Sequence, residues 1–296
     1  MQNSRIPMYI AITQNMANII ASLSLVYLCG MKVEGVALGT LIAQYAGFLM
    51  GLALWVRNYG KLQRYWEIKN YKLRIKGKEG TGIWEKGAML RFFQVNRDIF
   101  LRTLCLVTVT LFFTSAGASQ GEIILAVNTL LMQLFTLFSY VMDGFAYAGE
   151  ALSGRYIGAR NREALTDTVR HLFGWGVAMA VLFTLVYALG GNAFLGLLTD
   201  DKEVIAVADT YFYWALAVPA VGIAAFIWDG IFIGATATRG MLLSMAAAAV
   251  SFFVLYYGLR PVLANHALWL AFLAYLLMRG AVQTGLSRGM IRKAFR

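Results

Sequence analysis

The sequence predicts an all-α integral membrane protein with about eight transmembrane helices. Of its 296 residues, 59% are hydrophobic and only 14% are charged, whereas soluble domains carry roughly 45–50% apolar and about 25% charged residues. The mean hydropathy is +0.63, and the apolar residues form continuous blocks without the period-two alternation of a membrane β-barrel. This composition excludes a soluble enzyme, a disordered chain and a nucleic-acid-binding domain.

Apolar stretches of about 20 residues, the length that a helix needs to cross a bilayer, recur along the chain. Short polar segments separate them, except for the long segment 57–95, which is rich in Lys, Arg and Gly. Only 3 prolines accompany 29 glycines, which favours long helices packed through small residues. The expected spans are 8–28, 36–56, 98–117, 123–146, 171–190, 207–230, 241–258 and 266–284.

The basic residues predict the orientation of these spans. If both ends of the chain lie on one side of the membrane, 23 of the 26 Lys and Arg residues fall on that side. Only Lys32, Lys202 and Arg260 fall on the other. Because Lys and Arg gather in cytoplasmic loops, we expect a plasma-membrane protein with both termini and 57–95 in the cytoplasm. The net charge of +11 then reflects topology and indicates no nucleic-acid partner.

Two pairs of segments indicate an internal repeat. Residues 5–8 resemble 239–242, residues 35–38 resemble 266–269, and the two offsets nearly agree. Repeats of this kind are common in transporters, whose substrate site lies between the halves; a chance match of small and apolar residues is the alternative. Four spans precede the second copy and none precedes the first. A true repeat therefore predicts about 145 further residues before Met1.

Three segments carry a resemblance to a known family. They are Asp-Gly-Phe-Ala-Tyr-Ala-Gly-Glu-Ala-Leu-Ser-Gly-Arg-Tyr-Ile-Gly-Ala-Arg at 143–160, Asn-Arg-Asp-Ile-Phe-Leu-Arg-Thr-Leu at 96–104 and Asp-Gly-Ile-Phe-Ile-Gly-Ala-Thr at 229–236. In this order and spacing they resemble the multidrug and toxic compound extrusion (MATE) transporters, and within that family the DNA-damage-inducible protein F branch.

The resemblance implies twelve helices in two six-helix lobes. Residues 1–56 would be the last two helices of the N-terminal lobe, 57–95 the interlobe loop, and 96–296 the C-terminal lobe with a basic tail. The first four helices would then be missing. It further implies export of amphiphilic or cationic compounds, driven by a proton or sodium gradient, with no cofactor and no enzymatic activity. The alternatives are a lipid-linked precursor flippase of the same superfamily and a non-transporting fragment.

Ionisable side chains at membrane depth are candidates for function because burying them is costly. The predicted orientation places Asp98, Arg102, Asp143 and Asp229 at similar depth on three helices of one lobe. They form either an Asp98–Arg102 pair along one helix, with the other acids solvated at helix ends, or a buried ion-pair cluster that exchanges partners during transport. A third alternative is proton coupling by one of the acids.

Further candidates lie beside these acids and in the first two spans. Glu150 lies two helical turns from Asp143 on the same helix face, and Tyr147 facing inward beside Asp143 would contact a cationic ligand. Asn18, Ser22 and Thr40 form a polar stripe on the first two spans. In MATE proteins the matching helix often carries Asn followed four residues later by Asp, which helps to bind the coupling cation. Here Asn18 matches but Ser22 replaces the Asp, so interhelical hydrogen bonding explains the stripe equally well.

Neither histidine supports a metal site or a catalytic group. We expect His171 and His266 to lie at the membrane interfaces, since neither belongs to a set of residues that would form a metal site or a nucleophilic triad. We therefore expect no bound metal. The expected partners are the lipid bilayer and small amphiphilic or cationic substrates.

Overall fold

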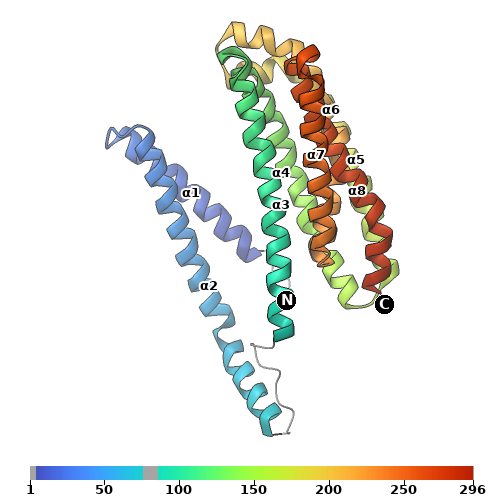
Figure 1. The fold of residues 1–296 in the computed structure, drawn as a ribbon. Helices are drawn as coiled ribbons and strands as arrows, with labels where there is room; N and C mark the ends of the chain where they lie inside the picture. The colour runs from blue at the N-terminus through green and yellow to red at the C-terminus, as the bar shows by residue number, and fades with distance from the viewer. Residues whose placement is uncertain (1–4, 76–85, 296) are drawn as a thin grey trace. The chain divides into compact units, whose positions relative to one another are not determined.

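A computed structural model describes residues 5–75 and 86–295 of the chain (Figure 1). Within these residues the secondary structure consists of α-helices with short turns between them, and no strand is present. Eight of the helices are long and apolar enough to cross a membrane. The helices are α1 Arg5–Tyr27, α2 Val33–Ile75, α3 Lys86–Ala118, α4 Glu122–Gly158, α5 Arg162–Leu198, α6 Lys202–Gly234, α7 Thr238–Leu263 and α8 Asn265–Ala294.

The prediction of an all-α membrane protein with eight spans is confirmed, but several helices are longer than the expected spans. The segment 57–95, expected as a loop, is helical at both ends, because α2 continues to Ile75 and α3 begins at Lys86; residues 76–85 lie outside the described part. Hydropathy detects only the length that fits in the hydrocarbon. A helix can continue beyond the membrane into water when its residues are Lys, Arg and Glu, because these have high helix propensity. Hydropathy does not detect such a polar extension.

Helices α1 and α2 form one compact unit, and α3–α8 form another. In the first unit, α2 packs on α1 through a stripe of small buried residues at four-residue spacing, Gly35, Gly39, Ala43 and Gly47. A Cβ atom on Gly39 would collide with Ser22 of α1. Small residues at this spacing let two helix backbones approach closely, and in membranes such packing replaces the hydrophobic effect as the main attraction between helices.

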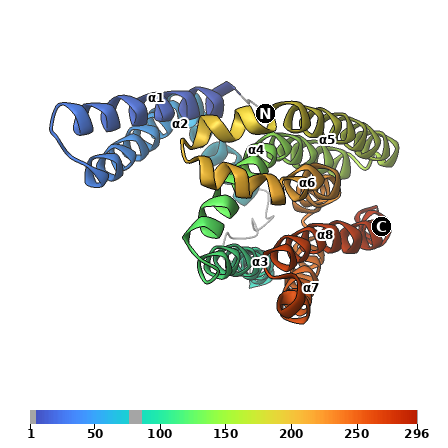
Figure 2. The ribbon, with the colours of Figure 1, turned by 90° about the horizontal axis from the view of Figure 1, so that it is seen from above.

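Helix α6 is the central element of the second unit. It contacts α4, α5, α7 and α8, while α3 packs mainly on α7 and also contacts α4 and α8. Figure 2 shows α6 between the α4–α5 pair and α8, with α3 and α7 on the far side of α8. Its residues 225–232 are all buried. A polar side chain in that segment therefore has other helices, rather than lipid, as its surroundings.

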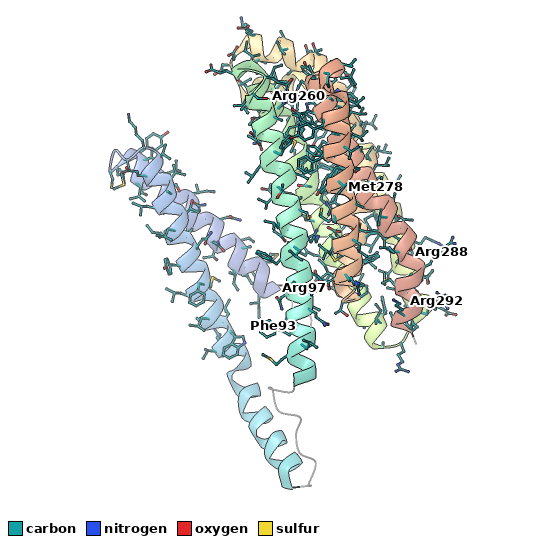
Figure 3. All side chains as sticks on the ribbon, in the orientation of Figure 1. Phe93, Arg97, Arg260, Met278, Arg288 and Arg292 are labelled. Atoms are coloured by element: carbon teal, nitrogen blue, oxygen red, sulfur yellow. The ribbon has the colours of Figure 1, made fainter. Side chains whose placement is uncertain are left out.

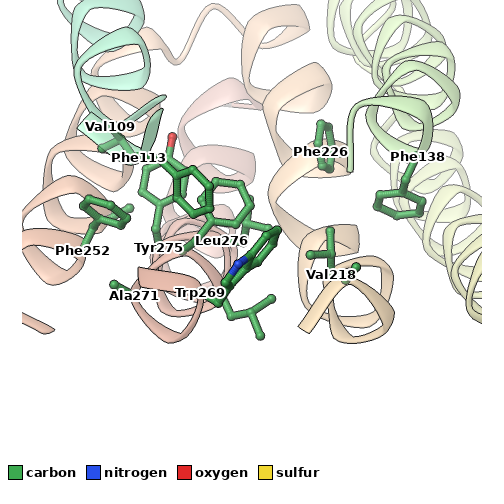
Figure 4. Packing of buried hydrophobic residues seen from close by; sticks show 14 of the residues in the cluster. Val109, Phe113, Phe138, Val218, Phe226, Phe252, Trp269, Ala271, Tyr275 and Leu276 are labelled. Carbon is green, nitrogen blue, oxygen red and sulfur yellow. The ribbon is translucent and has the colours of Figure 1, made fainter. Parts of the chain in front are cut away.

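Aromatic side chains fill most of the space between the helices of this second unit. Phe113 of α3 meets Trp269 and Phe272 of α8 with ring centroids 5.2 and 5.4 Å apart. On the other side of α6, Phe138 of α4 meets Phe226 at 6.0 Å. Figure 4 shows these two groups as separate layers, with Tyr275 and Leu276 in the first and Val218 in the second. The Phe113–Trp269 and Phe138–Phe226 pairs are edge-to-face, which is a favourable geometry for aromatic rings, and the Phe113–Phe272 pair is tilted.

Two glycines of α6 set the distance between α6 and α4. A Cβ atom on Gly230 would overlap the carbonyl group of Ala146, and one on Gly234 would overlap Ser153 and the carbonyl oxygen of Glu150. The buried hydroxyl of Ser153 also lies 3.4 Å from the carbonyl oxygen of Ile231. This close crossing fixes α4 against α6 within one helical turn of Asp229.

Candidate functional site

A buried carboxylate bonded to two arginines lies where α3, α6 and α8 meet. Asp229 of α6 is 5% exposed, and its Oδ2 accepts hydrogen bonds from Arg102 of α3 and Arg279 of α8. Its Oδ1 accepts a 2.5 Å hydrogen bond from Nε2 of Gln283, one turn further along α8. We refer to Asp229, Arg102, Arg279 and Gln283 as the Asp229 cluster.

Neighbouring contacts hold α8 in register with α6 at the cluster. The indole Nε1 of Trp228 donates to the hydroxyl of Thr284 at 2.9 Å. A Cβ atom on Gly280 would come within 2.8 Å of Ala224, so the two backbones approach closely here. The guanidinium of Arg279 lies 5.5 Å from the ring centroid of Phe226, at cation–π distance. Met278, the neighbour of Arg279, lies between Arg260 and Arg288 along the unit in Figure 3, well away from both helix ends.

Asp143 of α4 supplies the second negative charge of the region. It is half-buried and interacts electrostatically with Arg279, Asp229 and Arg102. Among the described residues it forms no hydrogen bond or ion pair through its side chain. Two arginines on one carboxylate leave a surplus positive charge, which is costly at membrane depth. Asp143 is the second acid within electrostatic range of both arginines, and it is bonded to neither.

The Asp229 cluster has unused hydrogen-bonding capacity. Nε of Arg102, Nε of Arg279 and Oε1 of Gln283 are buried and have no hydrogen-bond partner within the described residues. Buried polar groups are normally paired, so each such atom is costly. A cluster with unpaired buried atoms holds its side chains less firmly in one arrangement than a fully hydrogen-bonded cluster does. An exchange of partners requires such looser positioning.

Asp98 does not form the intrahelical pair with Arg102 that its spacing allows. Its carboxylate accepts from the exposed Arg97 at 3.0 Å and from the buried hydroxyl of Thr238, the first residue of α7, at 3.3 Å. Arg102 is on Asp229 instead. Both carboxylates are 5% exposed, so burial does not distinguish them, and the difference lies in their partners. Asp98 is already bonded to Arg97 and Thr238, which leaves Arg102 for Asp229. Asp98 therefore lies outside the Asp229 cluster.

Arg279 and Gln283 were not predicted as site residues, although 266–284 was expected to span. The charge count assigned Arg279 to the cytoplasmic side, whereas it is 5% exposed and bonded to Asp229. A signal was present in the sequence, because Arg279 and Gln283 are four residues apart and follow a long apolar run. Two polar residues at that spacing inside a span share one helix face.

The structure places Glu150 and Tyr147 apart from the cluster. Glu150 is half-buried on α4, and its side chain forms no hydrogen bond or ion pair within the described residues. Tyr147 is 71% exposed in the unit that the structure describes, and its contact with a cationic ligand stays a prediction.

The polar stripe of the first two spans is brought together. The Oδ1 atom of Asn18 accepts from the hydroxyl of Ser22 at 3.0 Å and from that of Thr40 on α2 at 3.5 Å. The single hydroxyl hydrogen of Thr40 is shared with the carbonyl oxygen of Val36, which is the nearer acceptor at 3.0 Å. In this arrangement the amide oxygen serves α1–α2 packing. Among the described residues, no group of three or more His, Cys, Asp or Glu side chains is placed to hold a metal ion.

Comparisons with known proteins agree on one family. The family model described as MatE matches residues 99–262. The chain is 40% identical to DNA damage-inducible protein F of Escherichia coli K12 over 94% of its own length, and it spans 58% of the length of that relative. It is 26% identical over 45% of its length to Protein DETOXIFICATION 45, chloroplastic, of Arabidopsis thaliana, covering 24% of that relative.

Solved structures share the fold. The bent form of the Vibrio cholerae MATE transporter VcmN matches 99% of this chain with a TM-score of 0.75 and 13% identity, and the chain covers 64% of it. A MATE transporter in the bent conformation gives a TM-score of 0.76 and 18% identity over 98% of this chain and 62% of its own. At such low identity the likeness concerns the fold alone.

Proposed function

This chain belongs to the MATE family of membrane transporters, and from that premise we propose that it takes part in the export of amphiphilic or cationic compounds, driven by a proton or sodium gradient. We place it in the plasma membrane, and the division of basic residues favours a topology with both chain ends in the cytoplasm. The observation that carries the proposal is the Asp229 cluster, a buried charged junction of three helices inside one unit. A transporter needs charges whose partners differ between its two facing states.

In this mechanism Asp229 is the fixed centre and Arg102 is the arm that changes partner. The side chain of Asp229 is 8% exposed and that of Arg279 is 6% exposed, whereas that of Arg102 is 18% exposed. Arg279 and Gln283 therefore hold Asp229 from α8, while Arg102 reaches it from α3 at the edge of the junction. Breaking the Arg102 contact therefore costs less free energy than breaking the Arg279 contact, because water still reaches part of the Arg102 side chain.

Asp143 is the carboxylate that we propose takes up the proton or the sodium ion. When a cation neutralises Asp143, Asp229 is the only remaining acid for two arginines and keeps Arg102. When the cation leaves, Asp143 competes for Arg102, and α3 is drawn toward α4. The cation thus has a different binding free energy in the two arrangements, which is the condition for coupling its movement to a conformational change.

Other predicted site residues have supporting roles in this proposal. Asn18, Ser22 and Thr40 form a polar contact between α1 and α2, which we propose as a second, weaker position for the coupling cation. Tyr147 presents an exposed aromatic face to amphiphilic substrates, and the half-buried Glu150 is the acid of α4 nearest to it in sequence. We assign no enzymatic step and no cofactor to any of these residues.

The flippase alternative receives less support. Binding a lipid-linked diphosphate in the membrane calls for arginines whose charge is not neutralised by the protein. Arg102 and Arg279 both bond to Asp229, and Asp143 offsets the remaining charge. The non-transporting alternative predicts no efflux from the natural coding region under any condition, which the same experiment measures.

The test is efflux of a fluorescent lipophilic cation from cells that lack other exporters and express the natural coding region. We expect efflux that stops when the proton and sodium gradients are collapsed. Asp143→Asn and Asp229→Asn should each lower the efflux rate at least tenfold at equal protein level. Asp209→Asn, an exposed acid on the same helix as Asp229, is the matched control and should leave the rate unchanged. Equal efflux from all four proteins would overturn the proposal.

A further inference from the structure

A cluster of aromatic rings surrounds His266 at the end of the second unit that carries the α7–α8 turn. Trp214 Nε1 donates to Nδ1 of His266 at 3.1 Å, and the hydroxyl of Tyr213 lies 3.0 Å from the same nitrogen. The ring of Tyr211 lies 4.7 Å from the imidazole, centroid to centroid. His266 is in the first turn of α8, and all three aromatic residues are on α6.

The indole contact determines which nitrogen of His266 carries the hydrogen. An indole N–H can only donate, so Nδ1 must accept and must be unprotonated, and the neutral ring then carries its hydrogen on Nε2. His171 shows the opposite arrangement. Its Nδ1 lies 2.7 Å from the carbonyl oxygen of Asp167, and because a carbonyl can only accept, that Nδ1 must carry a hydrogen.

Uptake of a proton by His266 is incompatible with the Trp214 contact. In the imidazolium both ring nitrogens are donors, so Nδ1–H would face the indole N–H and the hydrogen bond would be lost. Tyr213 can follow the change, because its hydroxyl can turn and accept from Nδ1–H. Protonation therefore moves the partner of Nδ1 from Trp214 to Tyr213.

The surroundings of the ring contain no carboxylate partner that would hold a charged His266. The titratable side chains that face it are Tyr211 and Tyr213, both from α6. From α7, Arg260 lies over the ring of Tyr256, 5.8 Å from its centroid. Nearby on α4 the polar group is the neutral Asn128, which bonds to Asn265 next to His266. Among the described residues, no acid forms a hydrogen bond or ion pair with the imidazole.

From this geometry we propose that His266 is a proton-binding site whose occupation releases Trp214 and leaves Tyr213 as the partner of Nδ1 in the contact between α6 and α8. The contact of α8 with α4 is independent of it, because Asn265 and Trp269 bond to Asn128 on either side of His266. The exchange of partners is therefore confined to the contact between α6 and α8. On the predicted topology this end lies on the outer side of the membrane. Protons are abundant on that side when a proton gradient is present.

The test is nitrogen NMR of the protein in lipid nanodiscs, labelled with ¹⁵N at histidine and tryptophan, between about pH 8 and about pH 5. The chain has only two histidines, so a His171→Gln variant assigns both. At high pH we expect His266 as the Nε2–H tautomer and His171 with hydrogen on Nδ1. On acidification the indole signal of Trp214, assigned with Trp214→Phe, should shift along the titration curve of His266.

His266→Gln is the matched variant, because its amide oxygen accepts from Trp214 at every pH. It should abolish the pH-dependent indole shift, while His171→Gln should leave that shift intact. Three results would each overturn the proposal: an Nδ1–H tautomer at His266, a His266 ring that stays neutral down to about pH 5, or an indole signal that does not move while His266 titrates. None of these measurements requires transport, so their outcome is independent of the proposed export function.

Discussion

Asp229 and Arg279, on α6 and α8, form an ion pair in which the two side chains are 8% and 6% exposed. A pair so deeply buried is weak evidence for net stabilisation, because desolvating both charges offsets their attraction. Breaking it on one side is a different matter, since the remaining charge stays buried without a partner. This asymmetry governs what substitutions in the Asp229 cluster should do.

Asp229→Asn should destabilise the protein more than any substitution of a single arginine. It leaves Arg102 and Arg279 around a neutral amide, and we expect a loss of about 3–5 kcal/mol in the free energy of unfolding. Arg279→Gln should cost less, because Asp229 keeps Arg102 and Gln283. Thermal unfolding in detergent micelles measures both. Arg97→Gln, which changes a side chain that is 63% exposed, is the control, and an equal loss in all three would contradict the buried pair.

Gly230→Ala should separate α4 from α6. The added Cβ has no room beside the carbonyl group of Ala146, so the crossing must widen, at a cost of about 1–3 kcal/mol. Gly144→Ala on α4 is the matched control, since nothing lies within 4 Å of its Cβ position, and it should be neutral or slightly stabilising. Unfolding of the two variants side by side decides the matter. A Gly230→Ala protein as stable as Gly144→Ala would show that the helices are not in close contact there.

Sequence reasoning predicted the helices and part of the site for identifiable reasons. Apolar length gave all eight spans, and the cost of burying charge singled out Arg102, Asp143 and Asp229 before any contact was known. It missed Arg279, because the charge count treats a basic residue near the end of an expected span as cytoplasmic, although the four-residue spacing to Gln283 indicated a shared polar helix face. Nor could it decide between partners for Asp98, since four-residue spacing permits a bond to Arg102 that tertiary packing replaces.

Asn128→Ala should weaken the contact of α4 with α8. It removes both amide hydrogen bonds with Asn265 and the bond from Trp269 Nε1, all at 2.8–3.0 Å. Interhelical hydrogen bonds in membranes contribute about 0.6 kcal/mol each on average, so the expected loss is about 2 kcal/mol. Asn96→Ala, which removes only an exposed bond to the carbonyl oxygen of Phe92, should cause no measurable change. The comparison uses the midpoint of unfolding in detergent.

Cysteine labelling in intact cells should reveal opposite sides for the α4–α5 and α5–α6 turns. After Cys29 and Cys105 are replaced by Ser, a cysteine at Arg160 should react with an impermeant reagent only when the cytoplasmic side is opened. A cysteine at Asp201 should react from outside. The reason is the concentration of Lys and Arg on the side that carries Arg160. Labelling of position 160 in sealed cells would reverse the predicted orientation.

Asp98→Asn should lower stability slightly and leave export intact. The Asn amide oxygen can still accept from the hydroxyl of Thr238, so the α3–α7 hydrogen bond survives. What is lost is a negative charge beside the first residue of α7, whose N-cap Ala237 offers no side-chain cap. A charge at a helix N-terminus contributes about 0.3–1 kcal/mol.

Asp98→Leu also removes the acceptor and leaves the buried Thr238 hydroxyl unpaired, so its loss should rise to about 1–3 kcal/mol. Efflux equal to the parent protein in Asp98→Asn, at equal protein level, would place Asp98 with the packing of α7. A drop as large as that of Asp229→Asn would instead bring Asp98 into the charge-exchange mechanism, with Arg102 moving between the two acids.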